Sequence, residues 1–263
     1  MEKKSTNHTF AVCAYKESPY LEECVKSVLQ QTICTNVIIC TSTPCPYIER
    51  IAKKYELEYY IKNGKSDICD DWNFAVSCAR TDLVTVAHQD DVYGKEYVEN
   101  LLRFSEDEDL LLFITDYLPL KNGQVGKRDI NSVLRRFLRG PLKWKWIAHS
   151  SKLRKMTLAF GNSVCCPSVT YNKKNTGEPV FTSEFKFCID WDTFLKFAQR
   201  QGNFAYVDKP LVYYRIHGGA TTKEFIEDHR RVKEDVAMFS KFWPDSVVRL
   251  IMLFYKRAYK TYD

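Results

Sequence analysis

The first 117 residues of this chain alternate short β-rich runs with longer runs of helical period, and this alternation constrains the fold more than any other feature. Strands separated by helices of about 10–15 residues build βαβ units, so we expect an α/β domain around a mostly parallel sheet. The predicted strands are Phe10–Tyr15, Asn36–Ser42, Leu57–Ile61, Leu83–His88 and Leu110–Tyr117. The predicted helices begin at Ser18 and otherwise cover Pro46–Tyr55, Ile68–Ala79 and Lys95–Phe104.

The start of the first helix is marked by Ser18 and Pro19, since serine is a preferred N-cap and proline suits the first helical position. The apolar residues that follow recur at helical spacing and predict one buried face. These residues are Leu21, Val25, Val28 and Leu29.

The second half of the chain is less regular, and we expect it to complete one catalytic domain before a helical C-terminal extension. A turn is predicted at Lys121–Gln124, and a helix at Trp191–Arg200 is predicted to stop at Gly202. Short strands are predicted at Ser168–Asn172, Phe204–Val207 and Leu211–Ile216.

Size and composition narrow the class of protein. A chain of 263 residues, 45% of them hydrophobic, can bury a large core without disulfides. No apolar run approaches the ~20 residues that span a bilayer, and the stretch after the N-terminus is too short for a signal peptide, so we expect a cytoplasmic protein. The ten cysteines include no Cys-x-x-Cys pair and lie mostly in apolar runs, which favours free thiols over disulfides or zinc.

The positive charge is concentrated in one segment. Residues 121–155 contain eleven Lys and Arg residues and a single acid, Asp129, which gives +10 in a chain whose net charge is +6. Such a block indicates an anionic partner, namely a phosphate-bearing substrate, an acidic membrane surface or a nucleic acid. The alternative from charge alone is a solvated face without a partner.

Polar residues interrupt the ends of three predicted strands. In an open α/β sheet, the ligand binds beyond the carboxyl ends of the strands. The interruptions lie at Ala14–Glu17, Thr41–Thr43 and His88–Asp91, so we expect one crevice to collect them.

Four residue groups offer chemistry, and each also has a structural interpretation. Asp90 and Asp91 follow a strand, where adjacent carboxylates suit a divalent cation or the first turn of a helix. Asp190 is either a helix N-cap or a general base. Arg215 and His217 end a strand, where they either hold phosphate and metal or are structural.

Four segments in order along residues 9–222 together resemble family 2 glycosyltransferases of the GT-A fold, of the bacterial polysaccharide type. The opening strand, Tyr-polar-Glu turn and helix of that family are similar to AVCAYKESPYLEECVKSVLQQT. The approach to its Asp-x-Asp motif is similar to NGKSDICDDWNFAVSCARTDLVTVAHQDD. Its catalytic-base helix and its closing Tyr-Arg-x-His turn are similar to IDWDTFLKF and YYRIHGGATT.

The resemblance implies a role for each matching residue. Asp190 would be the catalytic base, and Tyr15 would lie on or near the nucleotide base. The residues implied in binding the nucleotide-diphosphate sugar are Ala14, Tyr15, Glu17, Ser42, Lys65, Asp90, Asp91 and Arg215. The residues implied as ligands of Mn²⁺ or Mg²⁺ are Asp90, Asp91 and His217. It also implies a GT-A domain at 1–222, with a nucleotide-binding half (1–117) and an acceptor-binding half (118–222), before a helical extension at 223–263.

The sequence departs from the family pattern at three places. Many members carry an Asp pair at the end of the second strand, where this chain has Cys40-Thr41-Ser42-Thr43, so base recognition must be made differently. His88 occupies the first position of the Asp-x-Asp-Asp pattern, and Ile189 replaces the acid before Asp190.

We therefore expect an inverting glycosyltransferase that moves a sugar from a nucleotide-diphosphate donor, a UDP-sugar first of all, to a hydroxyl of a glycan or lipid-linked glycan. The expected location is the cytoplasm, with peripheral contact to the anionic inner face of the membrane through the basic segment, and no nucleic acid is expected as partner. The alternatives are a nucleotidyltransferase, although AYKESPY lacks the glycine of a phosphate loop, and a basic protein that binds nucleic acid or another anionic surface.

Overall fold

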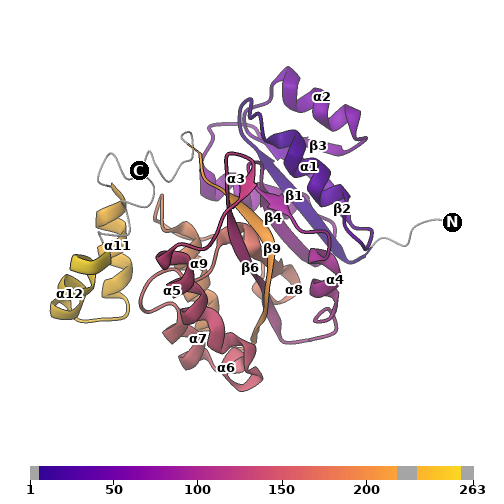
Figure 1. The fold of residues 1–263 in the computed structure, drawn as a ribbon. Coiled ribbons are helices and arrows are strands. Elements are labelled where there is room, and N and C mark those ends of the chain that lie inside the picture. Colours follow the sequence, from indigo (N-terminus) through magenta and orange to yellow (C-terminus); the bar gives the residue numbers. More distant parts are fainter. Residues whose placement is uncertain (1–5, 218–229, 256–263) are drawn as a thin grey trace.

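A computed structural model describes residues 6–217 and 230–255, and its centre is one nine-stranded sheet (Figure 1). The N-terminal part of this sheet is parallel, as the sequence predicts. Its strands lie in the order β3 (Glu58–Ile61), β2 (Asn36–Thr41), β1 (His8–Ala14) and β4 (Leu83–His88). Their carboxyl ends therefore meet at one edge, which positions the loops described below.

The rest of the sheet is mixed, because β8 (Val169–Asn172) runs antiparallel to both of its neighbours, β4 and β6 (Leu110–Lys121). Beyond β6 lie β9 (Asn203–Arg215), parallel to it, and β5 (Val92–Tyr93), while β7 (Gln124–Val125) pairs with β6. β9 is one long strand where the sequence predicts two, because pairing with β6 continues past an irregularity before Pro210.

The residues of each strand point alternately to two separate cores, one on each face of the sheet. Phe10 and Val12 of β1 face α1 (Leu21–Leu29), α2 (Pro46–Lys54) and α4 (Tyr97–Leu102). The opposite face packs against a larger set of helices. These are α3 (Ile68–Cys78), α7 (Ser151–Thr157), α9 (Ile189–Ala198), α11 (Arg230–Ser240) and α12 (Asp245–Tyr255).

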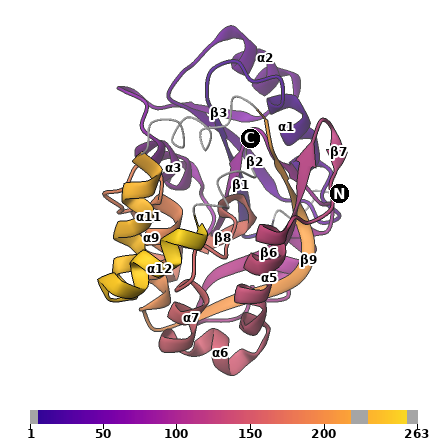
Figure 2. The same ribbon diagram turned by 60° about the vertical axis from the view of Figure 1, so that its left-hand side comes forward.

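No helix or strand was predicted from the sequence for the basic segment, residues 121–155. The segment forms a series of short helices. They are α5 (Ile130–Arg139), the 3₁₀ turn η1 (Gly140–Lys143), α6 (Lys145–His149) and α7, and they lie beside β6 and β9 (Figure 1, Figure 2). The turn η2 (Cys166–Ser168) and α8 (Lys173–Thr176) flank β8. A charged segment is ordered here because several of its arginines have buried partners, as shown below.

Two predicted helix ends are wrong. The first helix begins at Leu21 without a side-chain cap. Ser18 lies before it, and its hydroxyl donates to Asp90 and accepts from the N–H of Tyr20. In that helix Leu29 is 42% exposed, outside the buried face. α9 ends at Ala198, and Gly202 instead makes a turn with φ +130° against Leu111.

The C-terminal part is helical in α11 and α12, while residues 218–229 and 256–263, which the predicted extension includes in part, lie outside the described residues. All ten cysteines are free thiols, as predicted. Among the described residues, none of the helices has the length and apolar character needed to cross a bilayer.

Candidate active site

Hydrogen bonds join the loops that follow β1, β2 and β4. The side chain of Gln89 accepts from the backbone N–H of Tyr15 and donates to its carbonyl, both at 2.9 Å. The N–H of Lys16 donates to the hydroxyl of Thr43 at 2.7 Å. The three strand ends named from the sequence therefore meet, as the parallel topology predicts.

The turn after β1 presents its side chains to solvent. Ala14 is the last, buried residue of the strand, whereas Tyr15 is 47% exposed and Glu17 is exposed. Between them Lys16 adopts φ +52°, a region that residues with a side chain seldom occupy, and its ammonium lies 4.9 Å from the Tyr15 ring centroid. An exposed aromatic ring on a conformationally constrained turn suits contact with a planar base.

Asp90 faces His217 across the crevice, with 3.3 Å between its Oδ2 and the imidazole Nε2. Its other oxygen accepts from the Ser18 hydroxyl at 2.9 Å, and Tyr20 lies beside the imidazole with ring centroids 5.0 Å apart. A carboxylate oxygen next to an imidazole nitrogen is a donor pair that suits Mn²⁺, and both side chains remain partly exposed.

Asp91 is placed differently from its neighbour. Its side chain is buried, and Oδ1 accepts from the backbone N–H of Arg215 at 2.8 Å, while Oδ2 lies 3.9 Å from Nδ1 of His88. Burial raises the pKa of this carboxyl to about 8. Asp91 thus ties the loop after β4 to the end of β9.

Arg215 is held by three internal contacts. Its Nε donates to the carbonyl of Asp90 at 2.7 Å, its terminal nitrogen forms an ion pair with Glu23, and its guanidinium carbon lies 4.4 Å from the centroid of the Tyr20 ring. Arg215 therefore fixes the backbone of the Asp90 loop and brings positive charge beneath it.

His88 lies under this loop and stacks on Trp72, with ring centroids 5.1 Å apart and planes inclined by 19°. Burial lowers its pKa to about 4, so the ring is neutral at physiological pH. Its Nε2 is buried and makes no hydrogen bond within the described residues.

The end of β2 acquires a carboxylate from another element. Asp71, in the first turn of α3, accepts from the hydroxyls of Ser42 and Ser66, both at 2.7 Å, and pairs with Lys62 at 3.0 Å. Lys65 lies in the same loop, exposed, and its carbonyl accepts from Lys62. Asp71 thus places a carboxylate at the end of β2, where the sequence of β2 itself has no acidic residue.

Asp190 lies in the first turn of α9 and is not the predicted N-cap, because the helix begins at Ile189. Its Oδ1 accepts from the N–H of Trp191 at 2.7 Å, and its Oδ2 accepts from the side-chain amide of Asn162 at 2.8 Å. Burial raises the pKa of Asp190 to about 6, against the opposing effect of Arg135. Such a carboxylate is charged yet basic at neutral pH, as a general base requires.

Cys165 follows Asn162, the partner of Asp190, by three residues. Burial raises the pKa of its thiol, and the charges of Asp91 and Asp190 act in the same direction. The contacts of Asn162 with Asp190 and of Ser18 with Asp90 were not predicted from the sequence, because each joins residues that are far apart in the chain. The effect of Arg135 on Asp190 was not predicted either.

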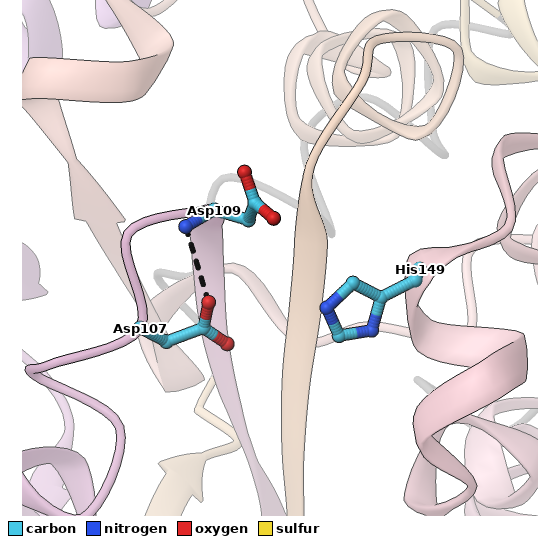
Figure 3. A group of neighbouring side chains, drawn as sticks. All are labelled: Asp107, Asp109 and His149. Atoms are coloured by element: carbon cyan, nitrogen blue, oxygen red, sulfur yellow. Dashed lines mark hydrogen bonds between the residues drawn. The ribbon is translucent and has the colours of Figure 1, made fainter.

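A second group of ligand-type side chains lies away from these loops. Asp107, Asp109 and His149 have ligand atoms within 4.8 Å of one another, and Figure 3 shows the imidazole turned toward the two carboxylates. Asp107 accepts hydrogen bonds from the backbone N–H of Asp109 and from the side-chain amide of Asn203. Nδ1 of His149 is hydrogen-bonded to the carbonyl of Lys145. Within the described ranges, no other three His, Cys, Asp or Glu side chains have ligand atoms this close together. Asp91 does not join Asp90 and His217 in such a group, and its Oδ1 accepts from the N–H of Arg215.

Comparison with known proteins identifies the domain. Residues 9–175 match the model of the family described as Glycosyl transferase family 2. A protein of Haemophilus influenzae described as an uncharacterized glycosyltransferase is 19% identical over 234 residues, which cover 86% of this chain and 70% of that protein.

Solved structures show the same fold. A mannosyltransferase of Pyrobaculum calidifontis, in complex with GDP-Man and Mn²⁺, superimposes with a TM-score of 0.64 at 14% identity, over 90% of this chain but 64% of that one. TarS 1–349 of S. aureus, in complex with UDP-GlcNAc, gives 0.58 at 15% identity, over 93% and 70%. These likenesses confirm the predicted α/β fold of the GT-A type.

Proposed function

Because the chain belongs to glycosyl transferase family 2, we propose that it transfers a sugar from a nucleotide-diphosphate donor to a hydroxyl of a glycan or lipid-linked glycan, with inversion at the anomeric carbon. The observation that carries this proposal is the Asp90–His217 pair beyond β4 and β9, with 3.3 Å between its carboxylate oxygen and imidazole nitrogen. Asp190 of α9, whose two oxygens are held by Asn162 and the N–H of Trp191, is the proposed base. The family match favours this activity over the nucleotidyltransferase and the nucleic-acid-binding protein. We place the reaction in the cytoplasm.

The donor would bind across the ends of β1, β2 and β4. Tyr15 offers an exposed ring to the base, with Ala14 and Glu17 in the same turn, and the Ser42–Asp71 pair offers hydrogen-bond acceptors to the base or ribose. Lys65, exposed on the loop after β3, offers a cation. We propose a UDP-sugar as donor, consistent with the UDP-GlcNAc complex of TarS, while the GDP-Man complex of the mannosyltransferase makes GDP the first competitor.

The metal ligands would be Asp90 and His217, whose oxygen and nitrogen already face each other. Mn²⁺ or Mg²⁺ held there would offset the negative charge that develops on the leaving diphosphate. Asp91, predicted as a third ligand, holds the N–H of Arg215, so its main contribution is to position the loop and β9 around Asp90. Arg215 adds a fixed positive charge next to the same loop.

Asp190 would remove the proton from the acceptor hydroxyl as that oxygen attacks the anomeric carbon. Asn162 and the N–H of Trp191 hold both carboxylate oxygens, which fixes the orientation of the base. General-base catalysis of this kind contributes roughly 10²–10⁴-fold to the rate. One displacement inverts the anomeric configuration without a covalent intermediate, so no cysteine nucleophile is needed.

The first test is a thermal-shift screen of UDP, dTDP, GDP and ADP, each with and without Mn²⁺. A ligand at about 100 times its Kd adds about 2.7 kcal/mol of stability, which raises the Tm by several degrees. We expect one nucleotide to give a Mn²⁺-dependent shift in the wild type and in Asp109→Asn, the control at the distant trio, but not in Asp90→Asn. Equal shifts in both variants would contradict the proposed metal site.

A further inference from the structure

Helix α5 turns its apolar side chains toward solvent. Ile130, Val133, Leu134 and Phe137 recur at the spacing of one helical face, and all four are exposed, Ile130 by 87% and Phe137 by 76%. We call these four residues the α5 stripe. Contiguous exposed apolar surface of this kind indicates a binding surface, because water is an unfavourable environment for apolar side chains.

The opposite face of α5 is cationic and anchored in the protein. Arg139, with 1% exposure, forms an ion pair with the buried Asp116 and donates to the carbonyl of Ser163 at 2.8 Å. Arg136 makes two hydrogen bonds of 2.8 Å to Asp208. Rotating α5 to hide the stripe would break these pairs, so the outward orientation is fixed by the fold.

The basic segment that contains the stripe also carries exposed aromatic and cationic side chains. Trp144 and Trp146, which follow α5 through the turn η1, are 58% and 67% exposed, and Lys127, Lys145 and Lys152 are exposed as well. Residues 121–155 together with their partners Asp116 and Asp208 carry eleven cations against three carboxylates, which leaves +8. The internal ion pairs therefore use only part of the charge of this segment.

We propose that the α5 stripe, with Trp144 and Trp146, inserts into the interface of a membrane that contains anionic lipids, while the neighbouring lysines contact the headgroups. An apolar helical face beside lysines and tryptophans is the pattern of helices that lie in the membrane plane. A second copy of this chain fits less well, because pairing two stripes would bring together two basic segments of +8 each. This inference goes beyond the transfer reaction and does not depend on it.

Docking through α5 would also orient the site. Arg139 of α5 donates to the carbonyl of Ser163, and the preceding residue, Asn162, donates to Asp190, so α5 adjoins the loop that holds the proposed base. If the proposed function holds, a lipid-linked acceptor in the docked membrane would present its sugar or phosphate beside Asp190. The basic segment would then hold the membrane that carries the acceptor.

Vesicle sedimentation tests the docking surface without any donor or acceptor. The protein is mixed with vesicles of phosphatidylcholine and phosphatidylglycerol in equal parts, and with vesicles of phosphatidylcholine alone. We expect the wild type to sediment with the mixed vesicles, less at high salt, and to bind the neutral vesicles at least tenfold more weakly. Equal binding to both vesicles, or to neither, would overturn the proposal.

Variants of the stripe make the test specific. The double variant Ile130→Ser with Phe137→Ser should reduce partition into the mixed vesicles at least tenfold, whereas Phe137→Trp should preserve it. The control Leu29→Ser, at an exposed leucine of α1, should leave this partition unchanged. Unchanged Tm and unchanged nucleotide binding in each variant would show that the fold and the donor site are intact. Partition that survives the double serine variant would overturn the proposal, as would a wild-type dimer that the double variant dissociates.

Brominated phosphatidylcholine in the mixed vesicles gives an independent readout, because it quenches tryptophans that enter the acyl region. Trp191 is buried at 1% exposure and cannot be reached, whereas Trp144 and Trp146 lie at the surface. We expect quenching in the wild type that is largely lost in a variant with both residues changed to Phe. Quenching that persists in that variant would place the contact elsewhere and overturn the proposed surface.

Discussion

Helices α1 and α5 are both amphipathic, but α1 turns its apolar face toward the core and α5 turns its apolar face toward solvent. In α1, Leu21, Val25 and Val28 are fully buried against the sheet, and the charged residues lie outside. In α5 the apolar stripe lies outside, and Arg139 is buried against Asp116. Hydrophobic periodicity thus predicts that a helix has two faces, but buried ion pairs decide here which of them turns inward.

This contrast extends to the halves of the sheet that each helix accompanies. The parallel strands β1 to β4 and their helices are held by apolar packing, and they carry the proposed donor site. The segment from α5 to α7 is held partly by ion pairs and by arginine bonded to backbone, such as Arg154, which donates to the carbonyl of Ala148 at 2.7 Å. Asp190 adjoins this segment through the loop after α7, where Asn162 donates to Asp190 and Ser163 accepts from Arg139.

The largest effect is expected at Asp190, which adjoins the second of these regions. Asp190→Asn should reduce turnover by about 10²–10⁴-fold, because the acceptor loses its base, while donor binding remains. Release of nucleoside diphosphate from the donor, with water as acceptor, measures this before the natural acceptor is known. A variant with full turnover would show that another group takes the proton.

Breaking the internal ion pair of α5 should lower the stability of the fold. Arg139→Met leaves Asp116 buried with Arg128 still nearby, so we expect the free energy of unfolding to fall by about 3 kcal/mol. Chemical denaturation measures the change, with Lys127→Met as the exposed control. Adding Asp116→Asn should recover part of the loss, and a double variant that is no more stable than Arg139→Met would refute the pairwise account.

A matched pair of substitutions compares the two helices directly. Val25→Ser, on the buried face of α1, should cost about 2–4 kcal/mol from lost packing and a buried hydroxyl. Val133→Ser, on the α5 stripe, should change stability by about 0.5 kcal/mol or less. Helix propensity changes equally in both, so equal losses by denaturation would mean that the stripe is covered by the protein itself.

The pH dependence of turnover should follow Asp190. Because its pKa is raised to about 6, the base is deprotonated above that pH and protonated below it. The rate should fall about tenfold per pH unit below pH 6, well above the range of an ordinary aspartate. Asn162 donates a hydrogen bond to the charged form of Asp190. Asn162→Ala should therefore raise the pKa of Asp190 and move the acidic fall in rate to higher pH. A fall in rate centred near pH 4 in both the wild type and Asn162→Ala would rule out Asp190 as the titrating base.

Much of the fold follows from local sequence. The β-rich runs of the first half predict β1 to β4 because each is short, apolar and bounded by a helix of clear period. The meeting of Tyr15, Thr43 and Gln89 follows from parallel strands alone. The strand predicted at Ser168–Asn172 is confirmed as β8, but its place between β4 and β6, antiparallel to both, was not predicted.

The candidate site was harder to predict, because its contacts join residues far apart in the chain. Asp71 reaches Ser42 from α3, and Asn162 reaches Asp190 from the loop after α7. The charge of the basic segment was likewise counted as free, whereas Arg139 and Arg154 are buried with partners. The roles predicted for individual residues, and the division into donor and acceptor halves, remain predictions.

The most direct test of the central claim is calorimetric binding of the nucleotide selected by the thermal screen, with Mn²⁺, to the wild type, Asp90→Asn and Asp190→Asn. The account predicts that Asp90→Asn loses Mn²⁺-dependent binding, because a proposed ligand is gone, whereas Asp190→Asn binds like the wild type. Binding retained in Asp90→Asn, or lost in Asp190→Asn, would contradict the division between a donor site at β4 and a base on α9.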